Sequence, residues 1–164
     1  MIRPEQPGDE AAIRALTTAA FASTPHSGGN EAAIVDALRA ADALVLSFVA
    51  LKHDIIVGHV AISPVTVDGS DCGWFGLGPV SVLPDRQRLG IGTALIEAAL
   101  EHLRADEAAG CVLLGDPAYY ARFGFVADPA LTYPGAPPDY FQCIVLAGPP
   151  AQGEVRYHQG FDAT

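Results

Sequence analysis

A short segment with two glycines, residues 87–92 (Gln-Arg-Leu-Gly-Ile-Gly), constrains the fold of this chain more than any other part. It follows an apolar run that ends at Val82-Leu83-Pro84, and it precedes an amphipathic stretch that reaches Arg104. A strand, a glycine loop and a helix in this order gather free backbone amides and positive dipole charge at the helix N-terminus. Gly90 and Gly92 carry no side chain that would keep an anion from the backbone. The segment therefore predicts a site for a phosphate-bearing ligand.

The composition is typical of one globular domain covering residues 1–164. Half of the residues are hydrophobic, and a chain of this length buries roughly 70% of its unfolded surface. No apolar run approaches the ~18 residues needed to span a bilayer, so we expect no membrane segment. Arg3, Glu5, Asp9 and Glu10 are charged where a signal peptide needs its apolar segment. These features predict a cytoplasmic protein.

The charge argues against nucleic acid as a ligand, and the cysteine and histidine spacings indicate neither disulfides nor a metal site. A net charge of −10 argues against nucleic acid, whose binding needs basic patches that neutralise phosphates. Arg86 and Arg88 are two of only nine basic residues, yet both lie beside the glycine loop. Cys72, Cys111 and Cys143 lack C-x-x-C spacing and are typical of reduced thiols. No carboxylate completes a metal-ligand set with the histidines at a familiar spacing, so we expect no metal ion.

The periodicity of apolar residues predicts short strands alternating with helices. Strands are expected at residues 2–4, 43–51, 55–67, 77–83, 111–114, 124–126, 141–146 and 154–157. Helices are expected at residues 10–21, 31–39, 91–104 and 117–123, with Asn30 and Asp116 as side-chain caps of the second and the fourth. The strand at 111–114 should lie parallel to the strand at 77–83, because a helix connects them. Residues 128–139 contain four prolines and a glycine and predict a loop.

Three kinds of glycine loop compete to explain the central segment. A nucleotide P-loop needs Lys followed by Ser or Thr after its second glycine, and the chain has neither there. A dinucleotide fingerprint needs Gly or Ala where this chain has Leu95. The third pattern, Q/R-x-x-G-x-G/A after a strand, fits Gln87, Gly90 and Gly92. That pattern is the pyrophosphate loop of acyl-CoA-dependent N-acetyltransferases.

Two motifs at a matching separation make the chain resemble the GNAT acetyltransferase superfamily. Residues 78–84 followed by the Q-x-x-G-x-G segment look like its central motif. Residues 120–125 (Tyr-Ala-Arg-Phe-Gly-Phe) are similar to its Y-x-x-x-G-F segment. Residues 114–120 (Leu-Gly-Asp-Pro-Ala-Tyr-Tyr) are particularly like the YhbS-like branch. The order of elements agrees with the family over nearly the whole chain.

The resemblance implies an α/β fold of the α+β kind. It has a mixed, mostly antiparallel sheet of about six or seven strands, splayed at the strand pair that binds CoA and flanked by about four helices. The residues support the splay independently, because Gly76, Gly78 and Pro79 disrupt regular pairing within one strand and favour a bulge.

The resemblance also implies a function as an N-acetyltransferase. An acetyl group would be transferred from acetyl-CoA, the co-substrate, to a primary amine of a small molecule or protein. The acetyl group would pass directly to the amine within a ternary complex. Backbone amides of Val80, Ser81 and Val82 would hold the pantetheine arm, with the Val80 N–H facing the thioester oxygen. Tyr120 would be the general acid that protonates the departing thiolate, and Tyr119 is expected to pack. The amides expected to hold the pyrophosphate belong to Gln87, Arg88, Leu89, Gly90, Ile91, Gly92 and Thr93.

Two departures from the family pattern leave alternatives open. Some members carry, in the bulged strand, a carboxylate that acts as the general base for the amine, but residues 74–78 contain no carboxylate. The candidates for a base are His26, Glu31, His59 and Asp139. Gly115-Asp116 also replaces an Asn that contacts pantetheine in many relatives. A non-catalytic acyl-CoA-binding or regulatory module is therefore the alternative function. The sequence does not determine whether the donor carries another acyl group, which amine is the acceptor, or whether the terminal strands mediate a homodimer.

Overall fold

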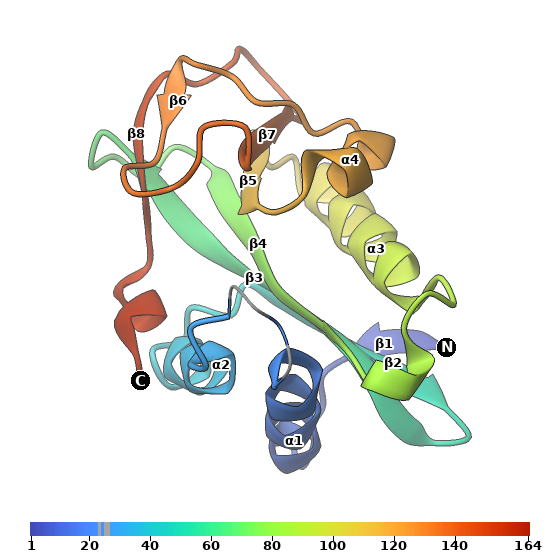
Figure 1. Ribbon diagram of the computed structural model, residues 1–164. Coiled ribbons are helices and arrows are strands. Elements are labelled where there is room, and N and C mark those ends of the chain that lie inside the picture. Colours follow the sequence, from blue (N-terminus) through green and yellow to red (C-terminus); the bar gives the residue numbers. More distant parts are fainter. Residues whose placement is uncertain (23, 25–26) are drawn as a thin grey trace.

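An eight-stranded sheet separates two pairs of helices (Figure 1). The computed structural model describes all residues except 23, 25 and 26. The strands are β1 (Ile2–Pro4), β2 (Leu46–Lys52), β3 (Ile55–Val67), β4 (Trp74–Val82), β5 (Gly110–Leu114), β6 (Leu131–Thr132), β7 (Phe141–Val145) and β8 (Gly153–Tyr157). The α-helices are α1 (Glu10–Phe21), α2 (Glu31–Ala40), α3 (Ile91–Ala105) and α4 (Pro117–Tyr120), and 3₁₀ turns cover Pro84–Arg86, Ala121–Phe123 and Gln159–Asp162. Among the described residues, no helix is long and apolar enough to cross a membrane.

The topology confirms the predicted fold class. The strands lie in the order β1-β2-β3-β4-β5-β7, and β8 pairs with the far end of β3 and with β6. Most pairs are antiparallel, whereas β4–β5 and β6–β8 are parallel. Helix α3 connects the two parallel strands β4 and β5, as expected for a crossover. The sheet has eight strands instead of six or seven.

Helices cover both faces of the sheet, with α1 and α2 on one side and α3 and α4 on the other (Figure 1). On β2, Leu46 and Ala50 belong to the core cluster that contains the apolar face of α3. Val49 of the same strand packs instead with Ile13 of α1 and Val35 of α2. Because successive side chains of a strand point to opposite faces, a strand covered on both sides is apolar on both faces. This explains why β2 is mostly apolar in sequence, with Ser47 as the exception between Leu46 and Leu51.

The middle of β4 departs from regular pairing on both of its edges. Between Leu77 and Val80, β4 contains one residue more than the facing segment of β3, so a bulge lies at Gly78-Pro79 as predicted. On the other edge, β4 pairs with β5 only from Trp74 to Gly76. Beyond Gly76, no ladder pair joins these two strands in the described part of the chain. The sheet is therefore splayed at the predicted strand pair.

Three predictions of strands and loops were wrong. Strand β4 begins at Trp74, three residues before the predicted start, because its first residues pair with β5. Residues 124–126 form no strand, and Val126 makes only an isolated bridge with Cys143. Within the predicted loop, Leu131–Thr132 forms β6 because it meets β8.

One of the two predicted helix caps is present. The Asp116 carboxylate accepts a hydrogen bond from the Ala118 N–H at 2.9 Å and caps α4, as predicted. The Asn30 side chain makes no cap on α2 with any described residue. Its Nδ2 donates instead to the backbone carbonyl of Ala163 at 3.0 Å. The predicted Asn30 cap was therefore wrong, because a residue from the other end of the chain binds this side chain.

Candidate active site

The glycine loop leads from the end of β4 into the N-terminus of α3. Gly90 and Arg88 both lie in the left-handed region, with φ of 85° and 65°, so the chain turns sharply before the helix. Gly90 is the N-cap residue, and no described side chain caps α3 there. The first amides of α3 therefore remain available to an anion.

A cavity of about 550 Å³ opens in front of these amides, and we call it the glycine-loop cavity. Arg86, Arg88 and Arg122 line it, and none of its lining residues is acidic. Three of the nine basic residues of a chain with net charge −10 thus surround one cavity. This concentration of positive charge next to free amides favours a phosphate-bearing ligand.

Most residues of the predicted CoA site line the glycine-loop cavity: Val80, Val82, Gln87, Arg88, Gly90, Ile91, Gly92, Thr93 and Tyr120. The other two point their side chains elsewhere. Ser81 is buried, and its Oγ donates to Thr17 Oγ1 of α1 at 3.4 Å. The Leu89 side chain is 64% exposed and does not line the cavity. The contacts that the family resemblance implies for these two residues would use their main chain only.

Tyr119 and Arg122 also line the cavity, although the sequence did not predict them there. Tyr119 packs as expected, against the core and against the rings of Tyr120 and Phe123, and its hydroxyl also lies 2.8 Å from Thr93 Oγ1. The Arg122 guanidinium lies 4.3 Å from the centroid of the Tyr119 ring, and its Nε donates to the Tyr119 carbonyl at 2.9 Å. Their separation of three residues, which places side chains together on a helical turn, was the signal available in the sequence.

Tyr120 lies in an aromatic cluster with its hydroxyl free. Its ring packs against Tyr119, Phe123 and Phe125, with centroids 4.9 to 6.1 Å apart. Burial, with a smaller contribution from Tyr119, raises the pKa of Tyr120 to about 12. The phenol is therefore protonated at neutral pH, and it forms no hydrogen bond with any residue that the structure describes.

Gly115 determines how close the Tyr120 ring can lie to the end of β5. A Cβ added at Gly115 would overlap that ring. The Gly115 carbonyl accepts a hydrogen bond from Gln142 Nε2 of β7 at 2.9 Å, which holds the backbone in place. Since the backbone cannot move away, a larger residue at position 115 would displace Tyr120.

A second cavity, of about 310 Å³, lies beside the bulge of β4, and we call it the bulge cavity. It shares Val80 and Tyr120 with the glycine-loop cavity. Its remaining lining residues are Phe21, Glu31, Ile34, Leu77, Gly78, Pro79, Leu114, Tyr133, Tyr157 and Phe161. Val80 and Tyr120 thus lie at the boundary between the two cavities.

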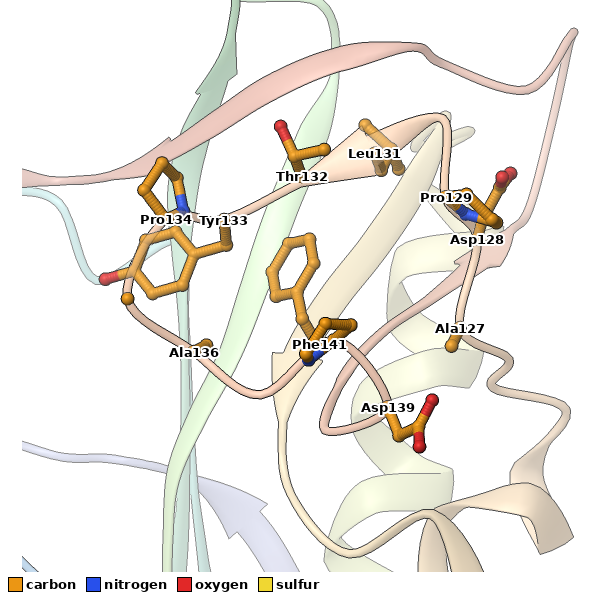
Figure 2. Close-up of a pocket in the computed structure, with 12 residues that line it drawn as sticks. Ala127, Asp128, Pro129, Leu131, Thr132, Tyr133, Pro134, Ala136, Asp139 and Phe141 are labelled. Carbon is orange, nitrogen blue, oxygen red and sulfur yellow. The ribbon is translucent and has the colours of Figure 1, made fainter.

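A third cavity, of about 540 Å³, lies within residues 127–141, and we call it the proline-loop cavity. Figure 2 shows the Tyr133 ring next to the ring of Phe141, with Asp128 and Asp139 on the side away from Tyr133. The two rings stack with centroids 5.4 Å apart. Tyr133 lines both this cavity and the bulge cavity, whereas Asp139 lines only this one.

Of the candidate bases that the structure describes, Glu31 alone lines the bulge cavity. Asp139 lies in the proline-loop cavity, and His26 lies outside the described residues. His59 is fully buried, with its Nε2 2.8 Å from Ser47 Oγ. Burial lowers the pKa of His59 to about 4, so its imidazole is neutral, but it lines neither cavity next to Tyr120.

The cysteines and metal-binding groups suggest no other chemistry. Cys111 and Cys143 are buried, and burial raises the pKa of both thiols, so they remain protonated at neutral pH. In the described part of the chain, no group of three His, Cys, Asp or Glu side chains is arranged to hold a metal ion.

Comparison with known proteins reveals relatives that match almost the whole chain. The family described as "Acetyltransferase (GNAT) domain" matches residues 44–127. The chain is 35% identical to the uncharacterized N-acetyltransferase YhbS of Escherichia coli strain K12, covering 99% of this chain and 98% of that protein. The crystal structure of YhbS in complex with CoA has a TM-score of 0.89 and covers 99% of this chain and 91% of that one. A GNAT family acetyltransferase from Brucella melitensis, in complex with acetyl-CoA, has 51% identity and a TM-score of 0.89, covering 99% and 97% of the two chains.

Proposed function

The chain belongs to the GNAT family of acetyltransferases, and we propose that it transfers an acetyl group from acetyl-CoA directly to a primary amine of a small molecule or protein. The observation that carries this proposal is the junction of the glycine-loop cavity with the bulge cavity at Val80 and Tyr120. A donor in one cavity and an acceptor in the other would meet at these two residues. The complexes of the Escherichia coli and Brucella melitensis relatives with CoA and acetyl-CoA support this donor.

In this proposal the glycine-loop cavity holds the CoA moiety. The amides of residues 87–93 and the side chains of Arg86, Arg88 and Arg122 would neutralise the pyrophosphate and the ribose phosphate. The pantetheine arm would lie along the edge of β4 beyond Gly76, where the splay leaves backbone groups without a neighbouring strand. The thioester would then reach the bulge next to Val80.

The chemistry proposed at the junction needs an oxyanion donor and an acid. The neutral amine nitrogen attacks the thioester carbon, and the Val80 N–H stabilises the charge that develops on oxygen. The C–N bond forms as the C–S bond breaks, and Tyr120 donates its proton to the departing sulfur. The nitrogen loses its extra proton to water, and water reprotonates Tyr120. Since a lysine-like amine costs about 4.6 kcal/mol to neutralise at pH 7, the rate should rise with pH.

The proposal is tested by following free thiol while the protein is incubated with acetyl-CoA and a panel of primary amines. Thiol release that depends on the amine is the expected result, and reactions without amine are the control. Binding of CoA by calorimetry without any turnover would support the non-catalytic module instead. Failure to bind CoA at tens of micromolar would contradict both functions.

A further inference from the structure

The lining of the bulge cavity indicates which amines the protein accepts. Resting on the proposed function, we propose that the acceptor is a primary amine on an apolar or aromatic body and that Glu31 binds it in its ammonium form. The bound ammonium releases one proton to water before the neutral nitrogen attacks the thioester. Among the residues that the structure describes, Glu31 is the one charged residue that lines the cavity, which is otherwise walled by apolar and aromatic side chains and by backbone. A ligand that enters beside Val80 and Tyr120 therefore meets a single carboxylate.

The Glu31 carboxylate is held in position before any ligand arrives. Glu31 is the first residue of α2. The Ser27 hydroxyl lies 2.7 and 2.9 Å from its two carboxylate oxygens. This contact restricts the rotamers of the side chain, so less entropy is lost when a cation binds. None of the described residues that line the cavity is basic, so none of them neutralises the carboxylate.

Aromatic rings make up part of the wall of the bulge cavity. Tyr133 and Tyr157 pack edge to face with centroids 5.1 Å apart, and Tyr157 lies 4.8 Å from Phe161. Figure 2 shows Tyr133 where the chain turns toward Pro134, at the boundary with the proline-loop cavity. Faces of such rings attract ammonium groups and also bury apolar ligand atoms. The wall therefore favours a cation with an alkyl or aryl body over a polar acceptor.

The same lining disfavours amines that carry a carboxylate. The α-carboxylate of a free amino acid would find no cationic partner among the described residues that line the bulge cavity, and Glu31 would repel it. At about 310 Å³ the cavity lies at the small end of ligand sites, which suits a body the size of a phenethyl group. Phenethylamine should thus be a better acceptor than phenylalanine.

A binding experiment tests the role of Glu31 without requiring turnover. Phenethyltrimethylammonium carries the positive charge but has no N–H to acetylate, and 2-phenylethanol is a neutral compound with the same aromatic body. By calorimetry on the full chain, we expect the cation to bind roughly tenfold more tightly than the alcohol. Glu31→Gln keeps the size of the side chain and an acceptor for Ser27, and it should abolish this preference. Glu10→Gln, at the first residue of α1, is the matched control and should leave the preference unchanged.

Kinetics separate this inference from the proposed function. With phenethylamine as acceptor, Glu31→Gln should raise the KM for the amine roughly tenfold and change kcat by less than about twofold. Unchanged KM in Glu31→Gln, or equal binding of the cation and the alcohol to the wild type, would overturn the inference while leaving transferase activity intact. Glu31-dependent binding of the cation without any thiol release would support this cation site and contradict the transferase.

Discussion

The hydroxyl of Tyr119 lies 2.8 Å from Thr93 Oγ1, and this contact joins α4 to the first turn of α3. Both residues line the glycine-loop cavity, so the contact holds α4 against the proposed CoA site. The next residue, Tyr120, faces the junction of the two cavities. Two adjacent tyrosines thus have different tasks in the proposed function, one in binding the donor and the other in the reaction.

Replacing Tyr119 should impair donor binding more than chemistry. Tyr119→Phe removes the hydrogen bond with Thr93, worth about 1 kcal/mol; because this bond lies within the protein, its loss should raise the KM for acetyl-CoA by at most roughly fivefold. The kcat should stay within about twofold of wild type, because the hydroxyl does not face the proposed thioester position. Tyr140→Phe, at an exposed tyrosine, is the control. A loss of kcat at unchanged KM would show that Tyr119 acts in the chemical step.

Replacing Tyr120 should have the opposite kinetic signature. Tyr120→Phe removes the proposed proton donor and should lower kcat by about 100-fold or more, with little effect on the KM for acetyl-CoA. Because burial raises the pKa of Tyr120 to about 12, the acid stays protonated throughout the pH range below that value. The kcat of the wild type should therefore show no alkaline decline up to pH 10. Wild-type turnover of Tyr120→Phe across this range would exclude the acid role.

A methyl group at Gly115 should displace the Tyr120 ring. Gly115→Ala should lower the free energy of unfolding by about 1–3 kcal/mol, as overpacked sites do, and should also lower kcat. Chemical denaturation and thiol release measure the two effects. In a double-mutant cycle, Gly115→Ala should cost much less stability when Tyr120 is already Ala. An equal cost in both backgrounds would mean that the ring is not what the methyl group meets.

Stability should fall as the pH drops, because His59 is buried in its neutral form. The pKa of His59 is lowered by burial to about 4, whereas an unfolded chain protonates histidine near pH 6.5. The stabilisation is thus complete above about pH 6.5 and is lost progressively toward pH 4. Between pH 7 and pH 5, we expect the free energy of unfolding to fall by about 2 kcal/mol from this residue.

Denaturation of two histidine variants at pH 7 and pH 5 checks this expectation. His59→Gln keeps a partner for Ser47 and should remove most of the pH dependence. His102→Gln, at an exposed position of α3, should retain it. Burial would raise the pKa of the neighbouring Glu5, but hydrogen bonds from Arg39 and Ser47 outweigh it and lower that pKa, so Glu5 stays ionised over this range. An unchanged pH dependence in His59→Gln would assign the effect to other groups.

The sequence predicted best what depends on neighbouring residues. The bulge at Gly78-Pro79 lies where two residues that disrupt pairing follow each other. The Asp116 carboxylate caps α4 by accepting from the N–H of Ala118, only two residues further along the chain. It predicted less well the elements that exist only through a distant partner. Residues 131–132 become a strand because β8 lies beside them, and residues 124–126 do not, because Val126 meets only Cys143.

The same distinction between local and distant contacts applies to the candidate site. The sequence by itself predicted the glycine loop with its free amides, since this loop follows from the order of residues in one continuous stretch, and its motifs implied the fold class through their resemblance to the GNAT family. Only the tertiary structure brought Tyr119 to Thr93, 26 residues away, and Asn30 to Ala163, 133 residues away. It alone placed Glu31 in a cavity with Tyr133 and Tyr157. Such contacts depend on how whole helices and strands pack, which local spacing does not encode.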